Sequence, residues 1–83
     1  MADKKFTVNI HSPDKLLGAY EVSLLVCPAV DGEIGIMAGH MPMLCALRAG
    51  ECRLTTDEET IRFAVTDGLL YVKNNTAEIF CEK

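Results

Sequence analysis

Apolar and polar residues alternate with a period of two along most of this chain. Phe6, Val8 and Ile10 share one face of a first segment, with polar residues between them. Residues 60–66 repeat the same alternation later in the chain. Such a period is typical of half-buried β-strands, and no window of the sequence carries the apolar stripe of an amphipathic helix. The pattern therefore predicts an all-β fold.

Two early segments depart from simple alternation. Residues 15–20 are interrupted by Gly18, which predicts two short strand pieces around a bend. Residues 21–27 become apolar at successive positions, which predicts a strand buried on both faces. Pro28 is expected to end that strand, because proline cannot donate a backbone hydrogen bond.

The second half of the chain contains two predicted hairpin turns. Asp67 and Gly68 form a dipeptide that favours a tight turn with positive φ, and Asn74 and Asn75 form another. Turn signals recur roughly every eight residues, and this spacing favours about nine or ten short strands in a β-sandwich or small barrel.

Length and charge limit the possible functions. The 83 residues suffice for one domain over residues 1–83. A net charge of −4 without clustered Lys and Arg argues against binding to nucleic acid or to anionic lipid. The apolar stretches are shorter than the ~20 residues that span a bilayer, and the N-terminus does not resemble a secretory signal. We therefore expect a cytosolic location.

The cysteines are predicted to stay reduced and to pack as small apolar side chains. They are Cys27, Cys45, Cys52 and Cys81. Their wide spacing lacks the close ligand pairs of a structural zinc site, and we expect no cofactor. The alternative class is a small β-barrel that binds a metal or acts as an enzyme through a cysteine with His11 or His40.

The most distinctive segment covers residues 32–44 and reads GEIGIMAGHMPML. A predicted loop within it consists of Gly39, His40, Met41 and Pro42. A rigid loop of mixed polarity suits the binding of a partner, because it loses little entropy on docking. From the residues alone, Glu33 is either a solvated turn residue or a contact to a partner.

This segment closely resembles the signature of the epsilon subunit of F-type ATP synthases. The family pattern is approximately G-E-[FIL]-G-[IV]-[LMY]-x-G-H-x-P-[LM]-[LV], followed by x-x-L-x-x-G, and residues 45–50 supply that ending as CALRAG. Residues 64–72 are similar to a further family hairpin, with Asp67 at the position of its first glycine. Residues 17–26 are similar to the family's first sheet.

The resemblance implies a ten-stranded antiparallel β-sandwich that has no catalytic residue. It implies a rotor subunit that binds the gamma subunit and the c-ring and couples ion flow to ATP synthesis. Matching the signature puts Glu33 toward the ring and the loop toward gamma. The partner-binding residues implied are Glu33, Gly39, His40, Met41 and Pro42.

The resemblance also carries expectations about location and regulation. It implies a peripheral position at the cytoplasmic face of a bacterial plasma membrane, or at the equivalent side of an organelle membrane. Family members commonly carry a C-terminal helical hairpin that stalls ATP hydrolysis. The sequence given ends at Lys83, so we expect a single domain without hairpin-type autoinhibition.

Overall fold

A computed structural model describes residues 4–39 and 41–81 of the chain. This part contains nine strands and no helix, which confirms the predicted all-β class. The strands are β1 (Phe6–His11), β2 (Leu16–Val22), β3 (Leu24–Ala29), β4 (Gly32–Ile36), β5 (Met43–Leu47), β6 (Gly50–Thr55), β7 (Thr60–Val65), β8 (Gly68–Lys73) and β9 (Thr76–Cys81). The count of about ten was therefore close.

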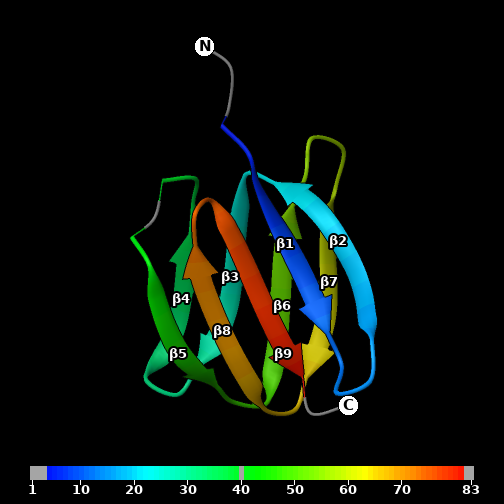
Figure 1. The fold of residues 1–83 in the computed structure, drawn as a ribbon, viewed down its shortest axis with the longest axis vertical. Coiled ribbons are helices and arrows are strands. Elements are labelled where there is room, and N and C mark those ends of the chain that lie inside the picture. Colours follow the sequence, from blue (N-terminus) through cyan, green and yellow to red (C-terminus); the bar gives the residue numbers. More distant parts are fainter. Residues whose placement is uncertain (1–3, 40, 82–83) are drawn as a thin grey trace.

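The strands belong to one sheet that curls into two layers. The hydrogen-bonded order is β2-β1-β9-β8-β5-β3-β6-β7, with β4 beside β3. In Figure 1, β2, β1, β9, β8 and β5 form a front layer, and β3, β4, β6 and β7 form a back layer. This arrangement confirms the predicted β-sandwich. One described pair departs from the antiparallel expectation, because β1 and β9 run parallel.

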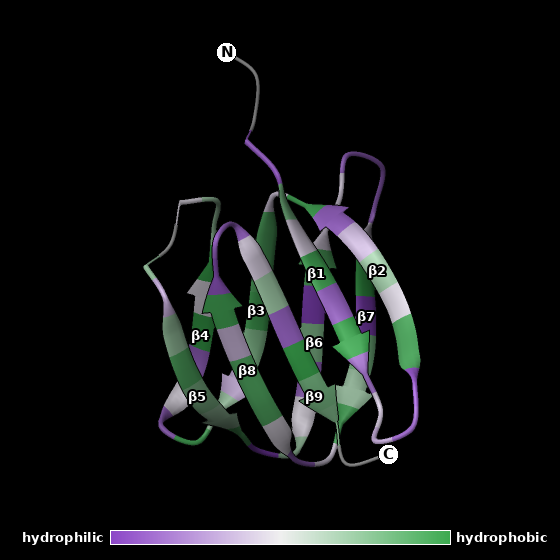
Figure 2. Cartoon of the chain, in the orientation of Figure 1, coloured by the Kyte–Doolittle hydropathy of each residue, from purple (hydrophilic) through white to green (hydrophobic). Residues whose placement is uncertain are grey.

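The core lies between the layers and is filled by the inward half of each alternating strand. Hydrophobic and hydrophilic bands alternate along the strands in Figure 2. The largest fully buried side chains include Leu25, Ile36, Leu54, Leu70 and Ile79. Burial of one such side chain contributes roughly 1.5–3 kcal/mol. Among the described residues no polar or charged residue is buried, so the core depends on apolar packing.

The hairpin predicted at Asn74 and Asn75 is confirmed. Both residues have positive φ, at 51° and 61°, and they join β8 to β9. Two consecutive residues of this kind match the right-handed twist of the flanking strands. Asparagine tolerates this conformation better than most residues.

The hairpin predicted at Asp67 and Gly68 is wrong. β7 pairs with β6, and β8 pairs with β9 and β5, so this segment crosses from the back layer to the front. The described glycines with positive φ are Gly32 and Gly39. Gly68 is required for a different reason, because a Cβ there would lie 2.1 Å from the carbonyl oxygen of Phe80. Close backbone approach therefore explains this glycine.

β2 is one strand from Leu16 to Val22, so two separate strand pieces are not found. The irregularity predicted near Gly18 is present, because the pairing with β1 shifts register between Ile10↔Gly18 and His11↔Leu16. A Cβ at Gly18 would lie 3.0 Å from the ring of Tyr20, two residues further along the same face. The glycine gives space to that ring beside the register shift.

The single strand predicted over residues 21–27 is in fact divided. Ser23 lies between β2 and β3, where the chain passes from the front layer to the back. Its backbone N–H donates to the carbonyl of Thr55 at 2.8 Å. In β3 only Leu25 and Cys27 are fully buried before the proline, since the outer face of the back layer is uncovered.

β3 also continues through Pro28 to Ala29, where it was expected to stop. Residues 24–26 pair with β6, and Ala29 pairs with β5. Pro28 falls between these two pairings, where β3 changes its neighbour. Its missing N–H therefore costs little at this point.

Candidate partner-binding surfaces

The structure separates the residues that were predicted to bind partners. Glu33 is the second residue of β4 and lies close to the β3–β4 turn. Gly39 follows β4, with φ at 85°, and Met41 and Pro42 precede β5. The β3–β4 turn and the β4–β5 loop lie at opposite ends of β4 (Figure 1). His40 lies outside the described residues, so the structure defines two surfaces and leaves His40 unassigned.

Glu33 is a strand residue that holds an ion pair. Its two carboxylate oxygens receive the guanidinium of Arg53 on β6, with Nη2 to Oε1 at 3.3 Å and Nη1 to Oε2 at 3.5 Å. Glu51 adds an oxygen 4.0 Å from Nη1. These three residues form a charged cluster on the outer face of the back layer. The pairing orients Glu33, although the side chain remains 52 % exposed.

The outer face of the front layer carries large apolar side chains. Leu44 on β5 lies opposite Tyr71 on β8, and Leu69 on β8 lies opposite Phe80 on β9. All four side chains are exposed, with Leu44 at 64 %. We name these four residues the apolar strip. Contiguous exposed apolar surface is typical of a site that another protein covers.

The apolar strip ends at a group of polar side chains on β1 and β9. Glu78 Oε2 accepts a hydrogen bond from Asn9 Nδ2 at 3.0 Å, and Glu78 Oε1 lies 2.5 Å from His11 Nε2. The ring of His11 stacks on Phe80, with centroids 4.9 Å apart. The parallel pairing of β1 with β9 brings these residues together.

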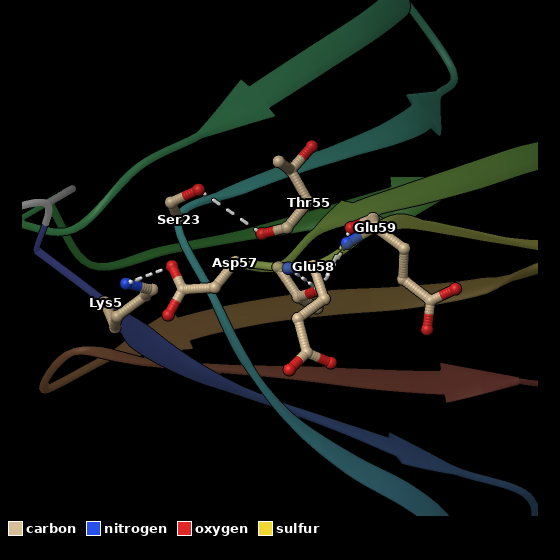
Figure 3. A network of polar contacts seen from close by, with 7 residues as sticks. Lys5, Ser23, Thr55, Asp57, Glu58 and Glu59 are labelled. Atoms are coloured by element: carbon tan, nitrogen blue, oxygen red, sulfur yellow. Dashed lines mark hydrogen bonds and ion pairs between the residues drawn. The ribbon is translucent and has the colours of Figure 1, made fainter.

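The acidic run of residues 57–59 forms a turn between β6 and β7. The hydroxyl of Thr56 accepts hydrogen bonds from the backbone N–H groups of Glu58 at 3.2 Å and Glu59 at 3.1 Å. Asp57 pairs with the ammonium of Lys5 at 2.8 Å. Figure 3 shows this network at the start of β1. It joins the two layers at one end of the sandwich.

The cysteines are free thiols that mostly face the core. Cys27 and Cys52 are fully buried, and their Sγ atoms share a hydrogen bond of 3.5 Å. This bond and burial raise the pKa of the Cys27 thiol, and burial raises the pKa of the half-buried Cys45 and Cys81 thiols. The predicted role as small buried side chains is confirmed for Cys27 and Cys52.

The alternative based on a cysteine with a histidine finds no matching geometry in the described part. His11 contacts Glu78 and Phe80 on the outer face, away from the buried thiols. Among residues 4–39 and 41–81, no group of three or more His, Cys, Asp or Glu is placed to hold a metal ion. No helix in these residues is long and apolar enough to cross a membrane.

Comparison with known proteins identifies the family. A family model described as the β-sandwich domain of the ATP synthase delta/epsilon chain matches residues 5–83. The chain belongs to this family. The ATP synthase epsilon chain of Chlorobium limicola is 37 % identical over 82 residues, which cover 98 % of this chain and 93 % of that protein. The ATP synthase epsilon chain of Latilactobacillus sakei is 40 % identical over 84 residues, covering 95 % of this chain and 57 % of that protein.

Solved structures share the fold. A chain of the Euglena gracilis mitochondrial ATP synthase, in an assembly of OSCP, F1 and c-ring, superposes with a TM-score of 0.88 at 16 % identity. The match covers 95 % of this chain and 51 % of that chain. A chain of the central stalk and c-ring of the Tetrahymena thermophila mitochondrial ATP synthase gives 0.79 at 20 % identity, covering 100 % and 67 %.

The family assignment settles the class of protein. The epsilon chain is a non-catalytic subunit of the rotary ATP synthase, as the resemblance predicted. The sequence interpretation missed the apolar strip, although residues 69–72 are apolar at four successive positions. Such a run in a strand signals apolar groups on both faces. The contact of Glu78 with His11 gave no local signal, since the two lie 67 residues apart.

Proposed function

We propose that this chain is a rotor subunit that binds the gamma subunit of ATP synthase and rests on the c-ring. In this role it transmits rotation between ion flow and ATP synthesis. The apolar strip is the observation that carries the proposal, because a stable rotor contact requires buried apolar surface. The family assignment supports it, and the similar solved structures are ATP synthase assemblies that include a c-ring, one of them with the central stalk.

The apolar strip and the adjoining β4–β5 loop are proposed as the gamma-binding surface. Met41 is 76 % exposed in that loop and precedes β5, which also carries Leu44. Covering a large apolar side chain contributes roughly 1.5–3 kcal/mol, so several together offset the cost of association. Gly39, His40 and Pro42 are included from their match to the signature.

The opposite end of β4 is proposed as the c-ring contact. The Arg53 guanidinium holds the Glu33 carboxylate in place beside the β3–β4 turn. An exposed, oriented charge of this kind contributes to register and to the rate of association more than to affinity. Attachment through these two surfaces gives a peripheral position at the membrane, on the cytoplasmic face in a bacterium.

The central test places a charge within the apolar strip. We expect Leu69→Asp to weaken binding to purified gamma subunit at least ~100-fold, because docking would bury an unpaired carboxylate. Ala64→Asp is the matched control, since Ala64 is an exposed outward residue of β7 in the back layer. That control should bind within ~3-fold of the unmodified chain, which is within the usual range for residues outside an interface. Isothermal titration measures both, and circular dichroism checks that each variant is folded.

The ring contact has a separate test. Glu33→Lys should weaken binding to purified c-ring and leave gamma binding unchanged, with Glu59→Lys at the other end of the sandwich as control. His40→Ala should weaken gamma binding alone. Full gamma affinity in Leu69→Asp, or full ring affinity in Glu33→Lys, would contradict the corresponding part of the proposal.

A further inference from the structure

Glu78 is the most firmly held carboxylate on the outer face of the front layer. Each of its oxygens has its own side-chain partner, Asn9 at 3.0 Å and His11 at 2.5 Å. The side chain is 26 % exposed, and His11 is fixed in turn by stacking on Phe80. A carboxylate held in this way loses little further freedom when a partner binds.

The surroundings of Glu78 are aromatic on two sides. Tyr71 lies opposite it on β8, and Phe80 follows two residues later on the same face of β9. Within the described residues, no Lys or Arg lies within 4.0 Å of its carboxylate. Among the described residues, the group that can pair with this charge is therefore His11, which is a cation only when protonated.

A partner that covers the apolar strip must also remove water from this carboxylate. Burying a carboxylate without a cation is costly, so the docking surface favours a partner that supplies one. A Lys or Arg can place its aliphatic stem over the two aromatic rings and its charge beside the carboxylate. The chain's net charge of −4 adds long-range attraction toward a basic segment.

We infer that Glu78 is a specificity-determining residue of the gamma-binding surface, and that it receives a Lys or Arg from an otherwise apolar segment of gamma. The inference rests on the proposed function, because it names the partner chemistry of the same surface. Asn9 and His11 act as positioning residues, since they orient the carboxylate.

The test removes the charge and keeps the shape. Glu78→Gln retains an oxygen and an amide for the neighbouring side chains and loses only the negative charge. We expect its affinity for purified gamma subunit to fall at least ~30-fold, as is typical for loss of one partner of a buried charge pair. Its dependence on salt concentration should also become weaker. Glu21→Gln is the control, because Glu21 is exposed on β2 of the same layer.

A second variant covers the case in which Glu78→Gln is poorly folded. Asn9→Ala leaves the charge in place and releases one oxygen, so affinity should fall by several-fold while the salt dependence persists. Unchanged affinity and salt dependence in both variants would overturn the inference. If Leu69→Asp still abolishes gamma binding in that case, the proposed function stands and only the role inferred for Glu78 is wrong. If Leu69→Asp also binds normally, the proposed gamma-binding surface itself is wrong.

Discussion

The outer faces of the two layers carry opposite chemistry on the same kind of strand. The front layer presents the apolar strip and one firmly held carboxylate, Glu78. The back layer presents the charged cluster and a further exposed arginine, Arg62. Inside the sandwich both layers contribute apolar side chains to one core. The inward positions therefore specify the fold, and the outward positions specify what each layer can bind.

The burial of the cysteine side chains also differs between the two layers. Cys27 and Cys52 belong to the back layer and are fully buried, whereas Cys45 and Cys81 belong to the front layer and are half-buried. The two thiols of the front layer are therefore closer to solvent than the two of the back layer. Variants of matched residues in the two layers test this comparison, and the charged cluster tests the back layer alone.

The largest effect is expected for a glycine in the front layer. Gly68→Ala should lower the free energy of unfolding by about 3 kcal/mol, because its Cβ would overlap the Phe80 carbonyl and the strands must shift. Gly35→Ala in β4 is the matched control. A Cβ there would meet Leu24 Cδ1 at 3.9 Å, so the change should stay within about 1 kcal/mol. Urea denaturation measures both, and equal effects would contradict the close approach at Gly68.

A smaller change in the free energy of unfolding is expected at alkaline pH from ionisation of the Cys27 thiol, which is buried in the back layer. Folding raises the pKa of Cys27 above that of an unfolded thiol, about 8.5. The stabilisation from this thiol is therefore complete below pH 8.5 and is lost as pH rises further. Between pH 7 and pH 10 the loss should be at most about 2 kcal/mol, because the hydrogen bond that raises the pKa of Cys27 lowers the pKa of Cys52.

Denaturation curves across this pH range compare the unmodified chain with single variants. Cys27→Ala should show a shallower decline of stability above pH 8.5 than the unmodified chain. Cys81→Ala should change the slope less, because that thiol is only half-buried in the fold. A Cys27→Ala variant with the original slope would show that this thiol is not responsible.

The smallest effect on stability is expected in the charged cluster. Arg53 is 34 % exposed and Glu33 is 52 % exposed, so water screens their ion pair. Arg53→Gln should change the free energy of unfolding by less than ~0.5 kcal/mol. Thermal unfolding measures this change, and Arg62→Gln on the neighbouring strand serves as control. A loss of several kcal/mol would show that the cluster stabilises the fold.

Local patterns in the sequence predicted the strands well. Phe6, Val8 and Ile10 face the core as the alternation required, and the Asn74–Asn75 turn has the expected backbone. These features depend on residues that are neighbours in the chain. The predicted turn at Gly68 failed because glycine has two uses, positive φ and close packing, which the sequence does not distinguish.

The sequence predicted less of the candidate sites than of the strands. The signature located Glu33 and the β4–β5 loop, but it did not show that Arg53 would pair with Glu33 across an intervening strand. The polar group at Glu78 depends on a parallel pairing between the first and last described strands. Alternation within a strand carries no information about which strand lies beside it.

That parallel pairing has a consequence for how the chain folds. β9 lies between β1 and β8, and it bonds Asn9 to Glu78 across 69 residues of sequence. The sheet cannot become continuous until the last strand joins the first, which requires closing a loop of nearly the whole chain. Kinetics dominated by such distant pairings are slow, in the millisecond-to-second range. The edges of β1 and β8 therefore remain open to other chains until that late step.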